Sequence, residues 1–261
     1  MQTAALTRIH RATVLAGTLL SMVTLGAEEI RVMTTGGFAA PYLALIAPFE
    51  QANGHKVVTV TTSTGLGEDS IPNRVRRREP ADVVILSNIA IDELTKEGRI
   101  VPDSRVPLVR SGIGMAVRAG ASKPDIGSVE ALKRTLSQAK SIAYSAQISG
   151  VYLSTELFPR LGIAEALKGK SLRIERERVG AVVARGEAEI GFQQISELLP
   201  IAGIDYVGPL PAEVQRITVF TAGVTVDARS PEAGRALIRF FISPEGKQAM
   251  AKYGMEPITA R

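Results

Sequence analysis

The chain has 261 residues, of which 45% are hydrophobic and 22% are charged, with a formal net charge of +5. It has no cysteine, no tryptophan and only two histidines, which excludes disulfide scaffolds, thiolate metal sites and cysteine nucleophiles. The surplus of 31 basic over 26 acidic residues is too small to indicate a nucleic-acid-binding protein. The composition therefore favours a binding protein over a redox or metal enzyme, and we expect no cofactor.

Residues 1–27 have the order of segments that is typical of an export signal. Arg8 and Arg11 make the start basic, residues 12–25 are uncharged and mostly apolar, and the small residues 26–27 precede two glutamates. We expect a secretory signal peptide, because a membrane-spanning helix, the alternative, needs about 20 apolar residues. Without cysteine the exported chain has no site for a lipid anchor, so we expect a free protein in the periplasm.

The residues after this signal alternate between short β-rich runs and helical patterns. We expect strands at 30–34, 56–62 and 82–87, a helix at 40–52 that Pro48 kinks, and further helices after the second and third strands. The dipeptide Asn53-Gly54 is a typical helix stop. This repeated strand–helix order predicts a parallel sheet that is covered by helices.

The same alternation continues to the C-terminus. The expected strands are 112–118, 141–145, 172–179, 189–193, 204–207 and 217–226, and the expected helices are 128–139, 150–158, 180–186 and two closing helices. Each closing helix opens with Ser-Pro-Glu, at Ser230 and Ser243, which predicts serine caps. No segment resembles a flexible linker, so a second domain requires crossings along extended segments near 108–114 and 216–223.

Three enzyme motifs fail on inspection. The triplet Gly169-Lys170-Ser171 resembles the end of a phosphate-binding loop, but Ala164 stands where that loop needs a glycine. A dinucleotide fingerprint beginning at Gly65 fails because Ser70 replaces its last glycine, and no Gly-x-Ser-x-Gly elbow is present. Acidic residues are plentiful, so an exported hydrolase or lyase that uses an acid pair remains an alternative.

Small hydroxyl, amide and glycine residues follow four of the expected strands. These turns are residues 34–37, 61–65, 145–150 and 193–194. Ligands of open α/β sheets bind beyond the carboxyl ends of strands, so the four turns could border one cleft. Hydroxyls and free N–H groups at helix starts bind anions without a formal positive charge. The alternative is that these turns only connect strands to helices.

Nearly the whole chain after the signal resembles the molybdate-binding family of periplasmic solute-binding proteins, the receptor components of ABC importers. The similar segments, in order, are 61–66 (TTSTGL), 80–87 (PADVVILS), 89–100, 184–191 (ARGEAEIG) and 240–257 (FFISPEGKQAMAKYGMEP). The resemblance implies an α/β fold of the two-domain, type II periplasmic-binding-protein class. Each domain would be a mainly parallel sheet flanked by helices, and crossover strands would join the domains. Domain I would contain residues 28–110 and 222–261, and domain II residues 111–221.

The resemblance also implies where a ligand binds. The family's first-turn serine falls on Gly37, its second-turn serine on Ser63 or a neighbour, and its binding tyrosine on Gln194. The implied ligand-binding residues are Gly36, Gly37, Thr62, Ser63, Thr64, Tyr144, Ser145, Ser149, Gly150, Arg178, Gln193 and Gln194. Glycine in place of serine predicts a roomier cleft, which suits a small di- or tricarboxylate in place of a molybdate-type oxyanion. Arg178 either pairs with a ligand carboxylate or is a solvated charge.

The implied function is that of a non-catalytic, monomeric receptor. It would capture a small anion between two closing domains and deliver it to an ABC permease. A sensor subunit that reports ligand occupancy to a membrane partner is an alternative. The arginine run at residues 74–78 is either a solvated helix face or a surface that docks the permease or attracts anions.

Overall fold

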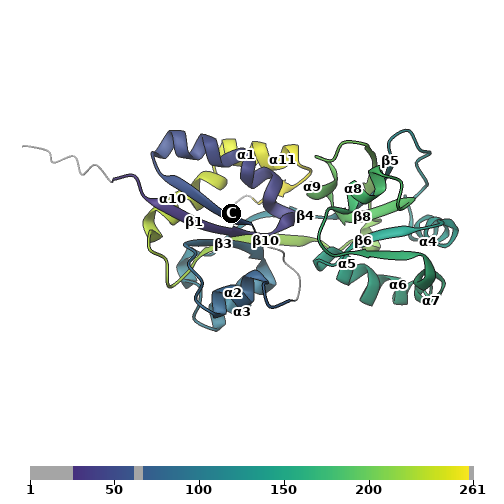
Figure 1. Cartoon of the computed structure of the whole chain (residues 1–261), viewed down its shortest axis with the longest axis horizontal. Coiled ribbons are helices and arrows are strands. Elements are labelled where there is room, and N and C mark those ends of the chain that lie inside the picture. The colour runs from purple at the N-terminus through teal and green to yellow at the C-terminus, as the bar shows by residue number, and fades with distance from the viewer. Residues whose placement is uncertain (1–25, 62–66, 259–261) are drawn as a thin grey trace, which may run out of the picture.

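Two separate sheets organise the computed structural model, which describes residues 26–61 and 67–258 (Figure 1). The expected signal peptide and the second-turn candidates Thr62, Ser63 and Thr64 lie outside the described residues. Within the described part, no helix combines the length and the apolar character that a bilayer crossing requires. Each sheet carries helices on both faces, so the fold is a two-lobed α/β architecture, as the sequence predicts. The prediction that each sheet is mainly parallel is wrong, because four strand pairings among the described residues are parallel and five are antiparallel.

The first sheet contains the strands nearest both ends of the described chain. Its order is β11-β4-β10-β3-β1-β2. The strands are β1 (Glu29–Thr34), β2 (Lys56–Thr61), β3 (Val83–Ser87), β4 (Val106–Ser111), β10 (Thr218–Val224) and β11 (Glu256–Pro257). β1 pairs in parallel with β2 and β3, whereas β10 is antiparallel to β3 and β4. Both faces of β3 are buried, which explains its continuous apolar sequence.

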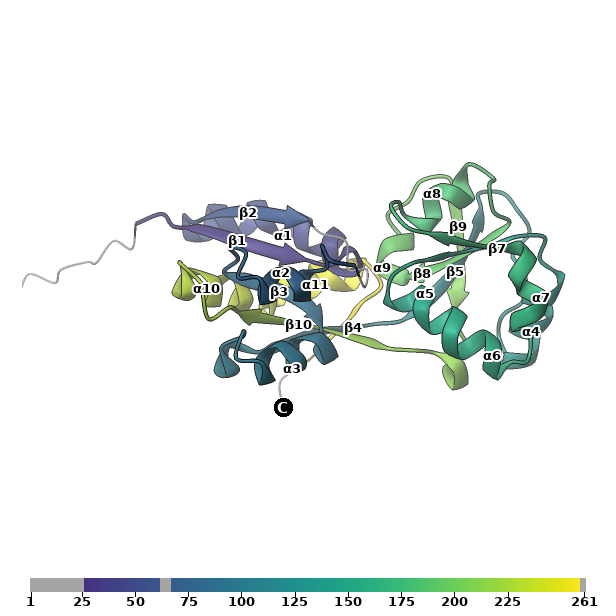
Figure 2. The same ribbon diagram turned by 60° about the horizontal axis from the view of Figure 1, so that its bottom comes forward.

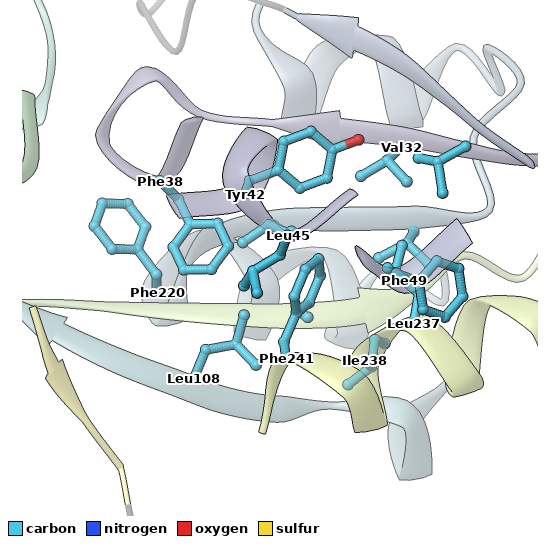
Figure 3. Close-up of a cluster of buried hydrophobic side chains, with 14 of the residues drawn as sticks. Val32, Phe38, Tyr42, Leu45, Phe49, Leu108, Phe220, Leu237, Ile238 and Phe241 are labelled. Atoms are coloured by element: carbon cyan, nitrogen blue, oxygen red, sulfur yellow. The ribbon is translucent and has the colours of Figure 1, made fainter. Parts of the chain in front are cut away.

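Helices on the two faces of this sheet form separate cores. One face carries α1 (Gly36–Asn53), α10 (Pro231–Phe241) and α11 (Pro244–Lys252), and the other carries α2 (Ile71–Arg76) and α3 (Asn88–Lys96). In Figure 3, aromatic rings of α1, among them Phe38 and Tyr42, pack toward Phe241 of α10. A single-turn 3-10 helix, Pro102–Ser104, precedes β4.

Helix α1 begins four residues earlier than the sequence pattern predicts. Gly36 and Gly37, which we expected in a turn, form its first turn. Pro48 lies inside the helix, and Gly54, with φ +71°, ends it as predicted. The early start brings the N-terminal end of the helix to the carboxyl end of β1, because only Thr35 separates the two elements.

The second sheet has the order β7-β6-β8-β5-β9. Its strands are β5 (Ile113–Arg118), β6 (Ile142–Ser145), β7 (Ser171–Ile174), β8 (Ile190–Gln194) and β9 (Ile204–Pro209). Its helices are α4 (Val129–Gln138), α5 (Ile148–Tyr152), α6 (Phe158–Arg160), α7 (Ala164–Leu167), α8 (Val179–Ala184) and α9 (Ile195–Leu198). A π-helical turn, Leu153–Leu157, joins α5 to α6, and 3-10 turns lie at Lys168–Lys170 and Ala212–Val214. The strand predicted at 172–179 is wrong beyond Ile174, because α8 begins at Val179.

The chain crosses between the two lobes twice (Figure 2). β4 ends at Ser111 in the first sheet, and β5 begins at Ile113 in the second. The return runs from Pro209 of β9 to Thr218 of β10. Residues 218–221, which the sequence assigns to domain II, pair with β3 and β4 of the first sheet. We therefore propose the predicted two-domain division with the second crossing moved to residues 210–217.

Three serines precede helices and differ as caps, among them the two predicted caps Ser230 and Ser243. The hydroxyls of Ser128 and Ser243 accept hydrogen bonds from Ala131 N and Gly246 N, both at 3.2 Å. Ser230 makes no side-chain cap, so the prediction is wrong there. Its backbone N–H instead donates to Oδ1 of the buried Asp82 at 3.0 Å, which already holds the start of α10.

Candidate ligand-binding site between the lobes

A small cavity of about 20 Å³ lies between the two lobes. It is lined by Thr35, Gly37, Thr218 and Phe220 of the first lobe and by Gln147, Ile148, Ser149, Gln194 and Glu197 of the second. These residues follow the carboxyl ends of β1, β6 and β8 or begin β10. The cavity therefore occupies the position that the polar turns predict. An adjoining groove of about 420 Å³ shares Gln147, Ile148 and Thr218 with it.

The N-terminal end of α1 contributes unused hydrogen-bonding groups to this cavity. Thr35 is 3% exposed, and its Oγ1 has no hydrogen-bond partner in the described chain. The backbone N–H groups of Gly36 and Gly37 also find no acceptor among the described residues. Such N–H groups carry the partial positive charge of the helix terminus, so this end of α1 suits an anionic oxygen.

Gly37 does not enlarge the cleft, contrary to our expectation. A Cβ atom at this position would lie 2.6 Å from Cζ of Phe220 and 3.5 Å from Cγ of Gln194. The volume that a serine would need is therefore filled by Phe220. Glycine is required here because β10 and β8 approach α1 closely.

Four candidates from the second lobe divide between the cavity and the protein interior. Ser149 lines the cavity, and its hydroxyl lies 3.1 Å from that of the buried Ser145. Gly150 is structural, since a Cβ there would lie 1.6 Å from the carbonyl oxygen of Ser145. Tyr144 packs edge-on against Phe158 in the second core and does not line the cavity.

Gln194 lines the cavity, but its amide also ties the crossing strands together. Its Oε1 accepts a 2.8 Å hydrogen bond from Ser111 Oγ, and its Nε2 donates to Thr218 Oγ1 at 3.0 Å. Ser111 and Thr218 are register partners at the ends of β4 and β10. The side chain at the position of the family's ligand-binding tyrosine therefore forms its hydrogen bonds with the strands that cross between the lobes.

Gln193 connects the start of α8 to a buried carboxyl group. Its Oε1 accepts from Val179 N at 2.9 Å, and its Nε2 donates to Glu197 Oε1 at 2.9 Å. Burial raises the pKa of Glu197 to about 7, while the positive charge of Arg178 and the hydrogen bond from Gln193 oppose that rise. Arg178 is half-buried at the N-cap position of α8 and acts on Glu197 through its charge.

Six of the nine lining residues are not among the candidates that the sequence provides: Thr35, Gln147, Ile148, Glu197, Thr218 and Phe220. Thr35 falls inside the polar turn 34–37, so its neighbourhood was visible. Glu197 lies in α9, the short helix that directly follows the strand of Gln193. Nothing in the sequence places that helix against α1.

The described residues contain no metal centre, and their arginine run at 74–78 is paired with acidic side chains. They contain no group of three or more histidine, cysteine or acidic side chains that could hold a metal ion. In the arginine run, Arg74 and Arg77 pair with Glu79, Arg76 with Glu97, and Arg78 with Asp227. The charge of this run is therefore compensated locally.

Residues 30–256 match the family model described as bacterial extracellular solute-binding protein. A protein from Pseudomonas sp. named aconitate isomerase is 42% identical over 233 residues, which cover 89% of each chain. The periplasmic molybdate-binding protein of Azotobacter vinelandii superposes with a TM-score of 0.70 at 20% identity, over 89% of this chain and 100% of that one. A substrate-binding protein of an ABC transporter from Agrobacterium tumefaciens has a TM-score of 0.70 at 15% identity, covering 90% and 81% of the two chains. The chain therefore belongs to the bacterial extracellular solute-binding proteins, and its fold is that of the type II periplasmic binding proteins.

Proposed function

We propose that this protein captures a small tricarboxylate of the aconitate type in the cavity between its lobes and delivers it to an ABC permease from the periplasm. The observation that carries the proposal is the start of α1, where Thr35, with an unpartnered hydroxyl, and Gly37, with a free N–H group, line the cavity, and the free N–H group of Gly36 lies between them in the chain. A carboxylate oxygen can accept hydrogen bonds from a hydroxyl group and from backbone N–H groups. The family supports a receptor role, and the name of the Pseudomonas relative supports the ligand class.

Contacts from both lobes favour a ligand with more than one carboxylate. The second lobe adds the hydroxyl of Ser149 at the start of α5, opposite Thr35 of the first lobe. A ligand that engages both helix starts would draw the lobes together. Micromolar affinity corresponds to about 8 kcal/mol, which several charge-assisted hydrogen bonds in an enclosed cavity can supply.

A second candidate function is the interconversion of cis- and trans-aconitate. The observation that favours it is the carboxyl group of Glu197, which is buried at the cavity and has a pKa raised to about 7. An ionised carboxylate would repel the anion that a receptor must hold. The same group can release and accept a proton near neutral pH, which is useful to a catalyst.

A thermal-shift series tests the proposed ligand class. The ligands are cis-aconitate, trans-aconitate, citrate, succinate, molybdate, tungstate and sulfate, each added in excess to the purified protein. We expect the aconitates to raise the melting temperature, because a ligand that binds only the folded state stabilises it. A rise with molybdate and none with any carboxylate would overturn the proposal.

A pair of matched variants tests the site. Thr35→Val keeps the shape of the side chain and removes the hydroxyl at the cavity, so we expect about tenfold weaker aconitate binding by calorimetry, from the loss of one hydrogen bond. Thr221→Val is the control, because Thr221 Oγ1 is also buried and unpartnered but does not line the cavity. Equal affinities in the two variants would remove the start of α1 from the site.

A further inference from the structure

We infer that Glu197 is the proton-transferring group of this cavity and that it moves a hydrogen between the two outer carbon atoms of bound aconitate, interconverting the cis and trans isomers. The inference rests on the proposed carboxylate cavity and assigns a catalytic residue to it. It goes beyond ligand capture, because a receptor needs no proton transfer.

Glu197 reaches the place where the proposed ligand binds. It lines the same cavity as Thr35 and Gly37, although it belongs to the second lobe and they belong to the first. A Cβ atom at Gly36 would lie 2.9 Å from Glu197 Oε1, so the carboxyl group lies against the first turn of α1. A ligand carboxylate bound by that turn would therefore be a direct neighbour of Glu197.

One oxygen of the Glu197 carboxyl group is fixed by a hydrogen bond, and the other is not. Gln193 Nε2 donates to Oε1, and Gln193 is itself fixed by the backbone N–H of Val179. Within the described chain, Oε2 receives no hydrogen bond and Glu197 forms no ion pair. Oε2 is therefore available to a ligand.

The environment keeps both protonation states of Glu197 accessible. Burial raises its pKa to about 7, and the charge of Arg178 and the hydrogen bond from Gln193 limit the rise. Arg178 is the charged group that acts on it from the neighbouring α8. An acid–base catalyst works best when its pKa lies close to the working pH, because each form must be present in turn.

Isomerisation of aconitate requires one base and no redox partner. The Glu197 carboxylate removes a proton from the methylene carbon, and the electron pair of that C–H bond forms a new double bond to the central carbon. The electron pair of the original double bond moves to the former vinylic carbon, which takes the proton back from Glu197. The geometry of the new double bond follows the conformation in which the cavity holds the former methylene arm. Charge that develops in between is stabilised by the donors at the start of α1.

The decisive experiment follows trans-aconitate by proton NMR in the presence of the wild-type protein, Glu197→Gln or Glu93→Gln. Glu93 is the matched control, because it lines the adjoining groove and receives the same isosteric change. We expect the wild type and E93Q to produce cis-aconitate, with a rate that rises as the pH passes through about 7. E197Q should bind trans-aconitate in calorimetry but react about 100-fold to 10,000-fold more slowly.

Each outcome separates this inference from the proposed function. A wild type that binds aconitate but does not isomerise it overturns the inference and leaves the carboxylate cavity intact. A wild type that binds no carboxylate overturns the proposed function. Isomerisation by E197Q at the wild-type rate shows that Glu197 is not the base. If E197Q does not fold, Glu197→Asp decides, because a retracted carboxylate should slow the reaction at least about tenfold while binding persists.

Discussion

At the scale of single residues, the cavity joins two groups that are unfavourable in the empty protein. Thr35 has a buried hydroxyl without a partner, and Glu197 has a carboxyl group whose ionisation burial opposes. Each arrangement costs stability, because a buried polar group loses its hydrogen bonds to water. Both residues line the same cavity, so a carboxylate ligand can give the Thr35 hydroxyl a partner and accept a hydrogen bond from the protonated form of Glu197.

The pKa of Glu197 leads to a prediction about stability. An acid whose pKa is raised on folding, here from 4.5 to about 7, binds more protons in the folded state between these values. The free energy of unfolding therefore falls in that window, by up to about 1.4 kcal/mol per pH unit. Glu197→Gln removes this loss, so in urea unfolding its advantage over the wild type should grow by on the order of 3 kcal/mol from pH 4 to pH 8.

Glu187→Gln provides the control for this titration. Glu187 is exposed, and its hydrogen bonds with Arg185 lower the pKa of its carboxyl group. Its removal should therefore produce no gain in stability as the pH rises. A stability difference between wild type and E197Q that is the same at every pH would mean that the carboxyl group of Glu197 is not perturbed by folding.

At the scale of elements, one carboxylate holds three segments together at the far end of the first sheet. Oδ2 of Asp82 accepts from Arg31 N of β1 at 2.7 Å, and Oδ1 accepts from Arg229 N and Ser230 N at 2.6 and 3.0 Å. Asp82 is 3% exposed. The N-terminal turn of α10 therefore rests on a residue almost 150 positions earlier in the chain, in place of a serine cap.

We predict that Asp82→Asn destabilises the protein by about 2 kcal/mol or more in chemical denaturation. The neutral amide has one accepting oxygen, so a buried backbone N–H group loses its partner and the remaining bonds lose their charge. Asp103→Asn is the control, because Asp103 pairs with Arg235 on the surface with 77% of its side chain exposed. Equal stability of the two variants would contradict the anchoring role of Asp82.

At the scale of the whole molecule, the lobes touch where α9 meets the first turn of α1. Ser196 Oγ donates a 2.6 Å hydrogen bond to the carbonyl oxygen of Gly37 across the cleft. A Cβ atom at Gly254, in the first lobe, would lie 2.7 Å from the side chain of Ile195 in α9. Gln194, which binds the crossing strands β4 and β10, directly precedes Ile195 and Ser196 in the chain. One short segment therefore contacts both the crossing strands and the opposite lobe.

We predict that Ser196→Ala shifts the ligand-free protein toward a more open arrangement. Loss of one buried hydrogen bond is worth about 1 kcal/mol, so the radius of gyration in X-ray scattering should increase and aconitate should bind a few-fold more weakly. Ser154→Ala is the control, because its hydroxyl bonds carbonyl oxygens of its own helical segment. Scattering and affinity equal to those of the wild type would show that this bond does not hold the lobes together.

The sequence by itself determined the class of fold and the edge of the sheets at which the cavity lies. Alternating apolar runs and helical periodicity are local properties, so most strands and helices could be predicted from short segments. The same holds for the polar turns at the carboxyl ends of β1 and β6, which place Thr35 and Ser149 at the cavity. These features need no knowledge of distant contacts.

Only the tertiary structure decided what the site residues do. The side chain of Phe220 fills the space beside Gly37, the amide of Gln194 binds Ser111 and Thr218, and Glu197 lies against the first turn of α1. These partners are separated by 24 to 183 positions in the sequence, and their distances are set by how two cores and two crossings pack. No local pattern encodes such distances. The sequence alone therefore does not reveal that the carboxyl group of Glu197 is buried at the cavity.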